Sequence, residues 1–131
     1  MSELQKSEHR LAMQSKRQKP KDTFADGVYV RQMHMPEGTY VVGKIHKREH
    51  VWFLLEGCIA VATEEKTEEY EAPCYVVSTG GTKRVILALE DSIFVNIHPN
   101  PDNTQDLTEL EKYNVVKTYD EYEQYINNKK Q

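Results

Sequence analysis

Short apolar runs separated by turn residues constrain this chain more than any other feature. From residue 28 to residue 99, β-branched and aromatic residues alternate with polar ones, and glycine, proline or acidic residues interrupt the runs. Residues 64–71 are predicted to form an acidic hairpin tip. Strands at intervals of roughly 8–12 residues predict an all-β sandwich or barrel. The predicted strands are residues 28–34, 39–46, 50–56, 58–64, 74–79, 82–90 and 92–99.

The segments on either side of the strands have a different character. Residues 1–22 are rich in Lys, Arg and Gln and hold few apolar residues, which predicts a frayed helix or a disordered basic arm. Residues 102–131 lack the strand pattern and contain two capping-box sequences, Asp106 to Glu109 and Thr118 to Glu121, which predict short helices. The expected organisation is therefore an arm, a β-domain over residues 23–101 and a C-terminal helical extension.

The last of these predicted helices carries a stripe of tyrosines. Tyr119, Tyr122 and Tyr125 recur at three-residue steps, so they fall near one face of a helix. We expect this face to pack on the barrel or on a partner subunit. Together with the exposed strand edges that a small barrel leaves open, it predicts a homodimer.

Length, charge and cysteine content limit the classes of function. A chain of 131 residues fits one domain, and its net charge of −4 provides no overall field that attracts nucleic acid or an anionic membrane. Only the basic arm is suited to weak contact with nucleic acid. No apolar stretch approaches the roughly 20 residues that span a bilayer, so we expect a cytoplasmic protein without a membrane partner. Cys58 and Cys74 are too few for a disulfide framework and are predicted to be buried thiols.

The stretch from Gly38 to Gly57 contains the ionisable residues that are best suited to ligand binding or catalysis. It places Lys44, His46 and His50 between two apolar runs and ends on a Glu-Gly turn. Its spacing, G-x5-K-x-H-x3-H-x6-G, is similar to the first motif of the cupin superfamily, G-x5-H-x-H-x3,4-E-x6-G. Lys44 stands at the position of the first motif histidine, and His50 stands at the position of the glutamate.

Other segments extend the resemblance. The sequence from Gly81 to Arg84 is similar to the end of the second cupin motif, with Arg84 in place of a histidine. Residues 24–112 as a whole resemble small cupin-like proteins of bacteriophages and prophages, through FADGVYVRQM, GKIHKREH, EAP, GTKRVILALED and His98. The resemblance implies a cupin-type antiparallel β-barrel, or double-stranded β-helix, in the cytoplasm of a bacterial host. It implies no established activity.

The resemblance leaves three interpretations of the barrel mouth open. In the first, His46, His50 and His98 supply imidazoles to one transition metal, such as zinc, iron, nickel, manganese or copper. Against this, Lys44 and Arg84 would bring positive charge next to the cation. In the second, Lys44 and Arg84 form a cationic pocket for a small anionic ligand. In the third, the pocket is a structural remnant without a ligand.

Two aromatic residues are further candidates. Trp52 shares a strand face with His50 and is predicted to line the pocket or to pack in the core. Tyr40 or Lys44 would move protons if the site were catalytic, although the sequence identifies no catalytic residue or substrate.

Three functional classes follow from these interpretations. The first is a ligand-binding or accessory protein of phage type. The second is a metal-dependent cupin enzyme, such as an isomerase, epimerase or dioxygenase. The third is a virion or host-interaction component with an inert pocket.

Overall fold

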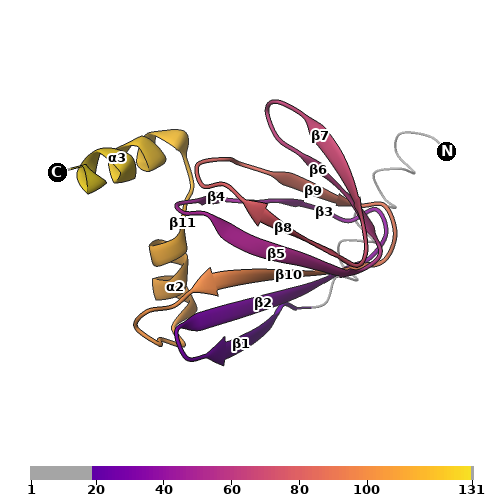
Figure 1. Ribbon diagram of the computed structural model, residues 1–131, viewed down its shortest axis with the longest axis horizontal. Helices are drawn as coiled ribbons and strands as arrows, with labels where there is room; N and C mark the ends of the chain where they lie inside the picture. The colour runs from indigo at the N-terminus through magenta and orange to yellow at the C-terminus, as the bar shows by residue number, and fades with distance from the viewer. Residues whose placement is uncertain (1–18, 131) are drawn as a thin grey trace.

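The computed structural model describes residues 19–130 as two antiparallel sheets that face each other, followed by two short helices (Figure 1). The larger sheet has five strands in the order β1-β2-β10-β5-β8, and the smaller has four in the order β3-β9-β6-β7. This arrangement confirms the predicted cupin-type β-fold with short C-terminal helices. The larger sheet consists of β1 (Lys21–Ala25), β2 (Val28–Met35), β10 (Ser92–Pro99), β5 (His50–Glu56) and β8 (Cys74–Ser78). The smaller consists of β3 (Tyr40–Val42), β9 (Val85–Ala88), β6 (Cys58–Ala62) and β7 (Thr67–Glu71).

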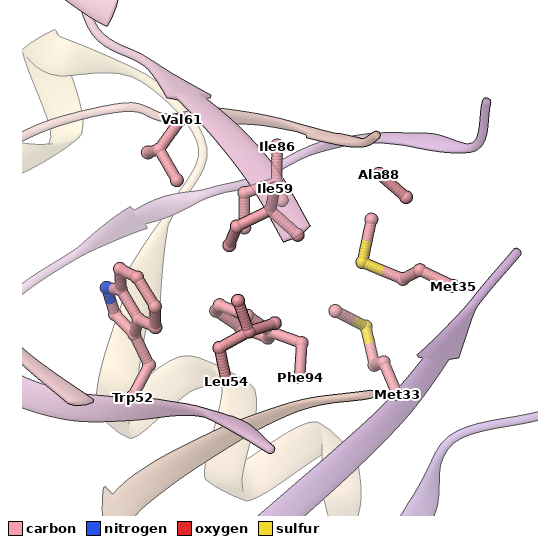
Figure 2. Packing of buried hydrophobic residues seen from close by; sticks show 9 residues of the cluster. All are labelled: Met33, Met35, Trp52, Leu54, Ile59, Val61, Ile86, Ala88 and Phe94. Atoms are coloured by element: carbon pink, nitrogen blue, oxygen red, sulfur yellow. The ribbon is translucent and has the colours of Figure 1, made fainter. Parts of the chain in front are cut away.

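Apolar side chains from the inner faces of both sheets meet at one end of the barrel (Figure 2). Successive side chains of a strand point to opposite faces, so alternate residues of β5 and β10 reach this interior. Leu54 and Ile59 are fully buried, and the rings of Trp52 and Phe94 lie 5.1 Å apart. The cluster is Met33, Met35, Trp52, Leu54, Ile59, Val61, Ile86, Ala88 and Phe94.

The run 39–46, predicted as one strand, is interrupted. β3 ends at Val42, and β4 (Ile45–His46) leaves the sheet to pair with β11 (Val115–Val116). At Gly43 the chain passes so close to its neighbour that an added Cβ would lie 3.2 Å from the Arg84 carbonyl oxygen, and the Gly43 amide donates to that oxygen. The break turns His46 toward the barrel mouth.

Three other segments differ from their sequence-based expectations. Residues 67–71, expected in a hairpin tip, form β7, because Glu68 and Tyr70 alternate with exposed residues and pair with β6. β9 covers only the centre of the expected strand 82–90. β1 begins at Lys21, inside the expected arm, and pairs with β2. The rest of the arm, residues 1–18, lies outside the described residues.

The C-terminal extension is capped as its sequence predicts. Asp106 accepts hydrogen bonds from the Thr108 and Glu109 amides at the start of α2 (Leu107–Asn114), and Thr118 accepts one from the Glu121 amide at the start of α3 (Tyr119–Lys129). Such caps satisfy amides that a helix N-terminus leaves unpaired. Among residues 19–130, no helix is long and apolar enough to cross a membrane.

Several contacts fix this extension at the end of the barrel where His46 lies. Val115 pairs with His46, and the Arg48 guanidinium donates to the Tyr113 carbonyl oxygen at 2.8 Å while lying 4.0 Å from the centre of its ring. The Tyr122 ring packs against Gly81, where an added Cβ would lie 2.7 Å from the ring. The extension therefore covers part of the barrel mouth.

Candidate functional site

A cavity of about 650 Å³ lies between the two sheets, next to α2. Its volume is within the range of small-molecule sites, roughly 300–1,000 Å³. Part of its lining is apolar and is shared with the core cluster, namely Met33, Trp52, Val61, Ile86 and Phe94. The remaining lining is mostly polar, and its polar side chains come from β1, β2, β4, β5, β10, α2 and the residues before β1, β4 and β9.

The structure brings together the histidines that the sequence singled out. His46 comes from β4, His50 from β5 and His98 from β10, and all three line the cavity. The ring centres of His46 and His50 lie 3.7 Å apart, those of His46 and His98 lie 5.3 Å apart, and the planes are within 14° of parallel. The stack continues from His98 to Tyr29, with ring centres 5.4 Å apart.

The surroundings keep these imidazoles uncharged. Burial, followed by repulsion from His50, His98 and Arg84, lowers the pKa of His46 to about 3. Burial lowers the pKa of His98 to about 4, with smaller contributions from His50 and Arg31. The pKa of His50 is also lowered, chiefly by burial. At neutral pH the cluster is therefore a set of neutral imidazoles, which act as hydrogen-bond donors and acceptors or as metal ligands.

The two predicted cations have different environments. Lys44 forms an ion pair with Glu111 of α2, and both side chains are nearly half exposed. Arg84 donates to the carbonyl oxygens of Thr82 and Thr79 at 3.2 and 3.4 Å, and burial lowers its pKa. Within residues 19–130, no carboxylate forms an ion pair with Arg84. Arg84 is therefore the predicted cation that remains available to an anion.

Sequence reasoning missed other polar groups of the lining. Arg31 and Asn96 line the cavity from β2 and β10, where they are paired in register. The Tyr29 hydroxyl donates to Asp22 at 2.5 Å, and burial and this carboxylate raise the Tyr29 pKa. The signal was the alternation along β2, since Tyr29, Arg31 and Met33 are two residues apart and share a face.

The two aromatic candidates lie in different sheets, Trp52 in β5 of the larger and Tyr40 in β3 of the smaller. Trp52 lines the cavity, is 3% exposed and packs against Phe94 and, nearly at a right angle, against the Tyr70 ring. Tyr40 is 44% exposed and does not contribute to the lining. Val41, between Tyr40 and Val42, instead packs against the core. The free thiols of Cys58 and Cys74 are half-buried and lie outside the cavity.

The imidazole cluster has the donors that a transition metal requires but not the orientation. A histidine binds a metal along a lone pair in its ring plane, and stacked parallel planes share no such point near both rings. Accordingly, no group of His, Cys, Asp and Glu side chains in the described part of the chain is arranged to hold a metal ion. The Nδ1 atom of His98 is nevertheless buried without a hydrogen-bond partner among these residues. Binding of a metal would require at least one ring to turn out of the stack.

Comparison with known proteins identifies the fold class. No protein-family model matches the sequence, and no curated protein matches it. Solved structures do match, among them a cupin-2 domain protein from Shewanella frigidimarina, with a TM-score of 0.55, 14% identity and coverage of 76% of this chain and 100% of that one. KdgF from Halomonas sp. matches with a TM-score of 0.53, 14% identity and coverage of 62% and 83%.

A cupin superfamily protein from Desulfitobacterium hafniense matches with a TM-score of 0.54, 10% identity and coverage of 62% of this chain and 77% of that one. The chain therefore has the cupin fold. At such identities the likeness establishes the fold alone.

Proposed function

We propose that this protein binds a small organic anion in the barrel mouth, with the anionic group at Arg84 and an apolar part against Trp52 and Phe94. The observation that carries the proposal is a cavity of suitable volume whose ionisable lining has an excess of positive charge. Four cationic side chains, Lys19, Arg31, Lys44 and Arg84, face two carboxylates, Asp22 and Glu111. The whole chain has the opposite sign, −4.

The local electrostatics support an anion in two ways. Asp22 accepts a hydrogen bond from Tyr29, and Glu111 forms an ion pair with Lys44. Neither carboxylate forms an ion pair with an arginine of the lining, so the guanidinium groups are available to an anionic ligand. A guanidinium presents parallel N–H groups that match a carboxylate or phosphate. The neutral imidazoles add donors and acceptors without adding a charge that must be desolvated.

A ligand screen with a matched pair of variants tests this function. Mono- and dicarboxylates and phosphate esters are added separately to the full chain, and the melting temperature and Kd are measured. We expect at least one of these anions to raise the melting temperature, and Arg84→Gln to weaken its binding about tenfold or more, because a charge-assisted hydrogen bond contributes about 1.5–3 kcal/mol.

The control is Lys83→Gln, which removes the same charge from the adjacent exposed residue outside the cavity lining. This variant is expected to bind as the wild type does. If no anion stabilises the wild type, or if both variants lose binding equally, the proposal is wrong.

A metal-dependent function is the second candidate, favoured by the neutral imidazoles and by the unpartnered Nδ1 atom of His98. His46, His50 and His98 would hold the ion, which would act as a Lewis acid or activate oxygen. Elemental analysis of untagged protein should then show one transition-metal ion per chain, retained in His34→Ala and absent in His46→Ala. A wild type purified without metal, and unable to bind added Zn²⁺, contradicts this candidate.

The resemblance to phage proteins adds a biological setting to the proposal. An accessory protein of phage type that captures a small anion would need the cavity but no catalytic group. An inert cavity, with the function on the outer surfaces, would instead give no ligand in either experiment.

A further inference from the structure

A second arginine lines the cavity on the wall that faces Arg84. Arg31 belongs to β2 of the larger sheet, whereas Arg84 immediately precedes β9 of the smaller sheet. Arg84 and Ile86 are two residues apart and both line the cavity, as do Arg31 and Met33. Stacked sheets lie about 10 Å apart, so the two guanidinium groups can reach one small molecule from opposite sides.

The strand registers of the larger sheet place Arg31 one row deeper than the histidine of β10. From the mouth inward, the paired residues are Tyr29 and His98, then Arg31, Asn96 and Trp52, and then Met33, Phe94 and Leu54. The third of these rows belongs to the core cluster (Figure 2). Arg31 is therefore aligned with a carboxamide and an indole, at the boundary between the polar and the apolar parts of the lining.

The two arginines act on different members of the imidazole cluster. Burial is the main cause of the lowered pKa values of His46, His50 and His98. The charge of Arg84 adds to this lowering of the pKa at His46 and His50. The charge of Arg31 adds to it at His98. Because repulsion between charges falls with distance, Arg84 lies near one end of the cluster and Arg31 near the other.

Neither arginine forms an ion pair with a carboxylate in the described part of the chain. Asp22 stands opposite Arg31 in the pairing of β1 with β2, but its carboxylate accepts from the Tyr29 hydroxyl. Asn96, which is paired with Arg31, carries a carboxamide with two N–H donors. Arg84 is half-buried and Arg31 is exposed, so a single carboxylate should prefer the Arg84 end.

The imidazole cluster sets the scale for the separation of the two arginines. The ring centres of His46 and His98, each affected by a different arginine, lie 5.3 Å apart. A straight chain of about five or six carbons holds its terminal carboxyl carbons roughly 5–6 Å apart, because each C–C bond is ~1.5 Å long. One guanidinium matches one carboxylate through two parallel N–H groups. The arrangement therefore suits a chain with a carboxylate at each end.

We propose that the cavity binds a small dicarboxylate, with one carboxylate at Arg84 and the other at Arg31 and Asn96. The inference rests on the proposed anion-binding function and narrows the ligand from one anionic group to two. The chain between the carboxylates lies against Trp52, which is in register with Asn96. A monoanion of the same length is bound more weakly, because it leaves Arg31 without a partner.

Calorimetry of the full chain with a series of dicarboxylates and their monomethyl esters tests the inference. Malonate, succinate, glutarate and adipate differ in length, and each ester removes one charge at nearly constant size. We expect glutarate or adipate to bind about tenfold more tightly than its ester, because the second carboxylate forms charge-assisted hydrogen bonds. Malonate is too short to reach both arginines and should show a smaller ratio.

A matched pair of variants assigns the second carboxylate to its site. Arg31→Gln should reduce the affinity ratio between dicarboxylate and ester to nearly one. The control is Lys21→Gln, which removes the same charge from the neighbouring strand β1, at an exposed residue outside the cavity lining, and should keep the wild-type ratio. Circular dichroism establishes that both variants are folded, and the comparison of each dicarboxylate with its ester in the wild type needs no variant.

The outcomes separate this inference from the function on which it rests. Equal affinities of dicarboxylate and ester in the wild type, with binding that still depends on Arg84, would overturn the inference and leave the anion-binding function intact. An unchanged ratio in Arg31→Gln would do the same. Tightest binding of malonate would mean that one cation holds both carboxylates, and it too would overturn the inference. If no anion binds the wild type, the proposed function itself is wrong and the inference fails with it.

Discussion

The two ends of the barrel interior are built from the same strands but have opposite chemistry. Along β5, the inward residues run from His50 through Trp52 to Leu54, and along β10 they run from His98 through Asn96 to Phe94. We call the end around Leu54 the closed end, because Leu54 is fully buried and does not line the cavity, whereas at the mouth His50 and His98 surround the cavity; Trp52 and Phe94 belong to both the core cluster and the lining. Close packing at the closed end provides stability, while the buried imidazoles at the mouth lower it in acid.

The largest expected effect is at the closed end. Leu54 is fully buried, so Leu54→Ala should lower the free energy of unfolding by about 2–5 kcal/mol through lost burial and a residual cavity. Urea denaturation measures this change. Under folding conditions the variant should bind an anion with the wild-type Kd, because Leu54 does not line the cavity. A loss of affinity in the folded variant would show that the two ends are not separable.

The mouth should determine the acid sensitivity of the fold. The folded pKa values of His46 and His98, about 3 and about 4, lie below the ordinary value of 6.5. Between pH 6.5 and pH 4 the unfolded chain therefore binds more protons. The free energy of unfolding should therefore decrease as the pH is lowered from 6.5 to 4, by up to about 1.4 kcal/mol per pH unit for each such imidazole.

A pair of glutamine variants tests whether the histidines of the mouth cause this pH dependence of the free energy of unfolding. His98→Gln removes one buried imidazole, so the fall in stability between pH 6.5 and pH 4 should become shallower, whatever the variant's stability at pH 7. His34→Gln, which removes an imidazole outside the cavity lining, is the control and should keep the wild-type slope. Equal slopes in the three proteins would mean that burial does not hold His98 neutral.

The same contrast explains how much could be predicted from the sequence. Strand periodicity predicted the fold, because it depends on local alternation, and motif spacing predicted that His46 and His50 meet at the mouth. His98 came from the family resemblance, and the sequence left the direction of its side chain open. Alternation alone does not show which face is inside when both are apolar, as in β3, whose sequence is YVV. The position of Tyr40 therefore could not be predicted. Arg31 was missed because a polar residue in a strand is usually solvent-facing.

The break at Gly43 and the pairing of β4 with β11 depend on long-range contacts. Val115 pairs with His46 across 69 positions of sequence, and no local sequence pattern in either strand predicts this pairing. Glu111 was missed for the same reason. It becomes part of the mouth only when α2 lies against the cavity.

The smallest expected change in stability is at the Lys44–Glu111 ion pair, which joins the barrel to α2 in the cavity lining. Both side chains are nearly half exposed, so Glu111→Gln should change the free energy of unfolding by less than about 1 kcal/mol. Its effect on binding should be larger, because it removes a carboxylate from the lining and releases Lys44 to a ligand. We therefore expect tighter anion binding in calorimetry, and a weakening of this gain by added salt.

Glu109→Gln removes a carboxylate from the same helix outside this cavity, and it should leave the affinity unchanged. Unchanged or weaker binding in Glu111→Gln would mean that the charge balance of the mouth does not select its ligand.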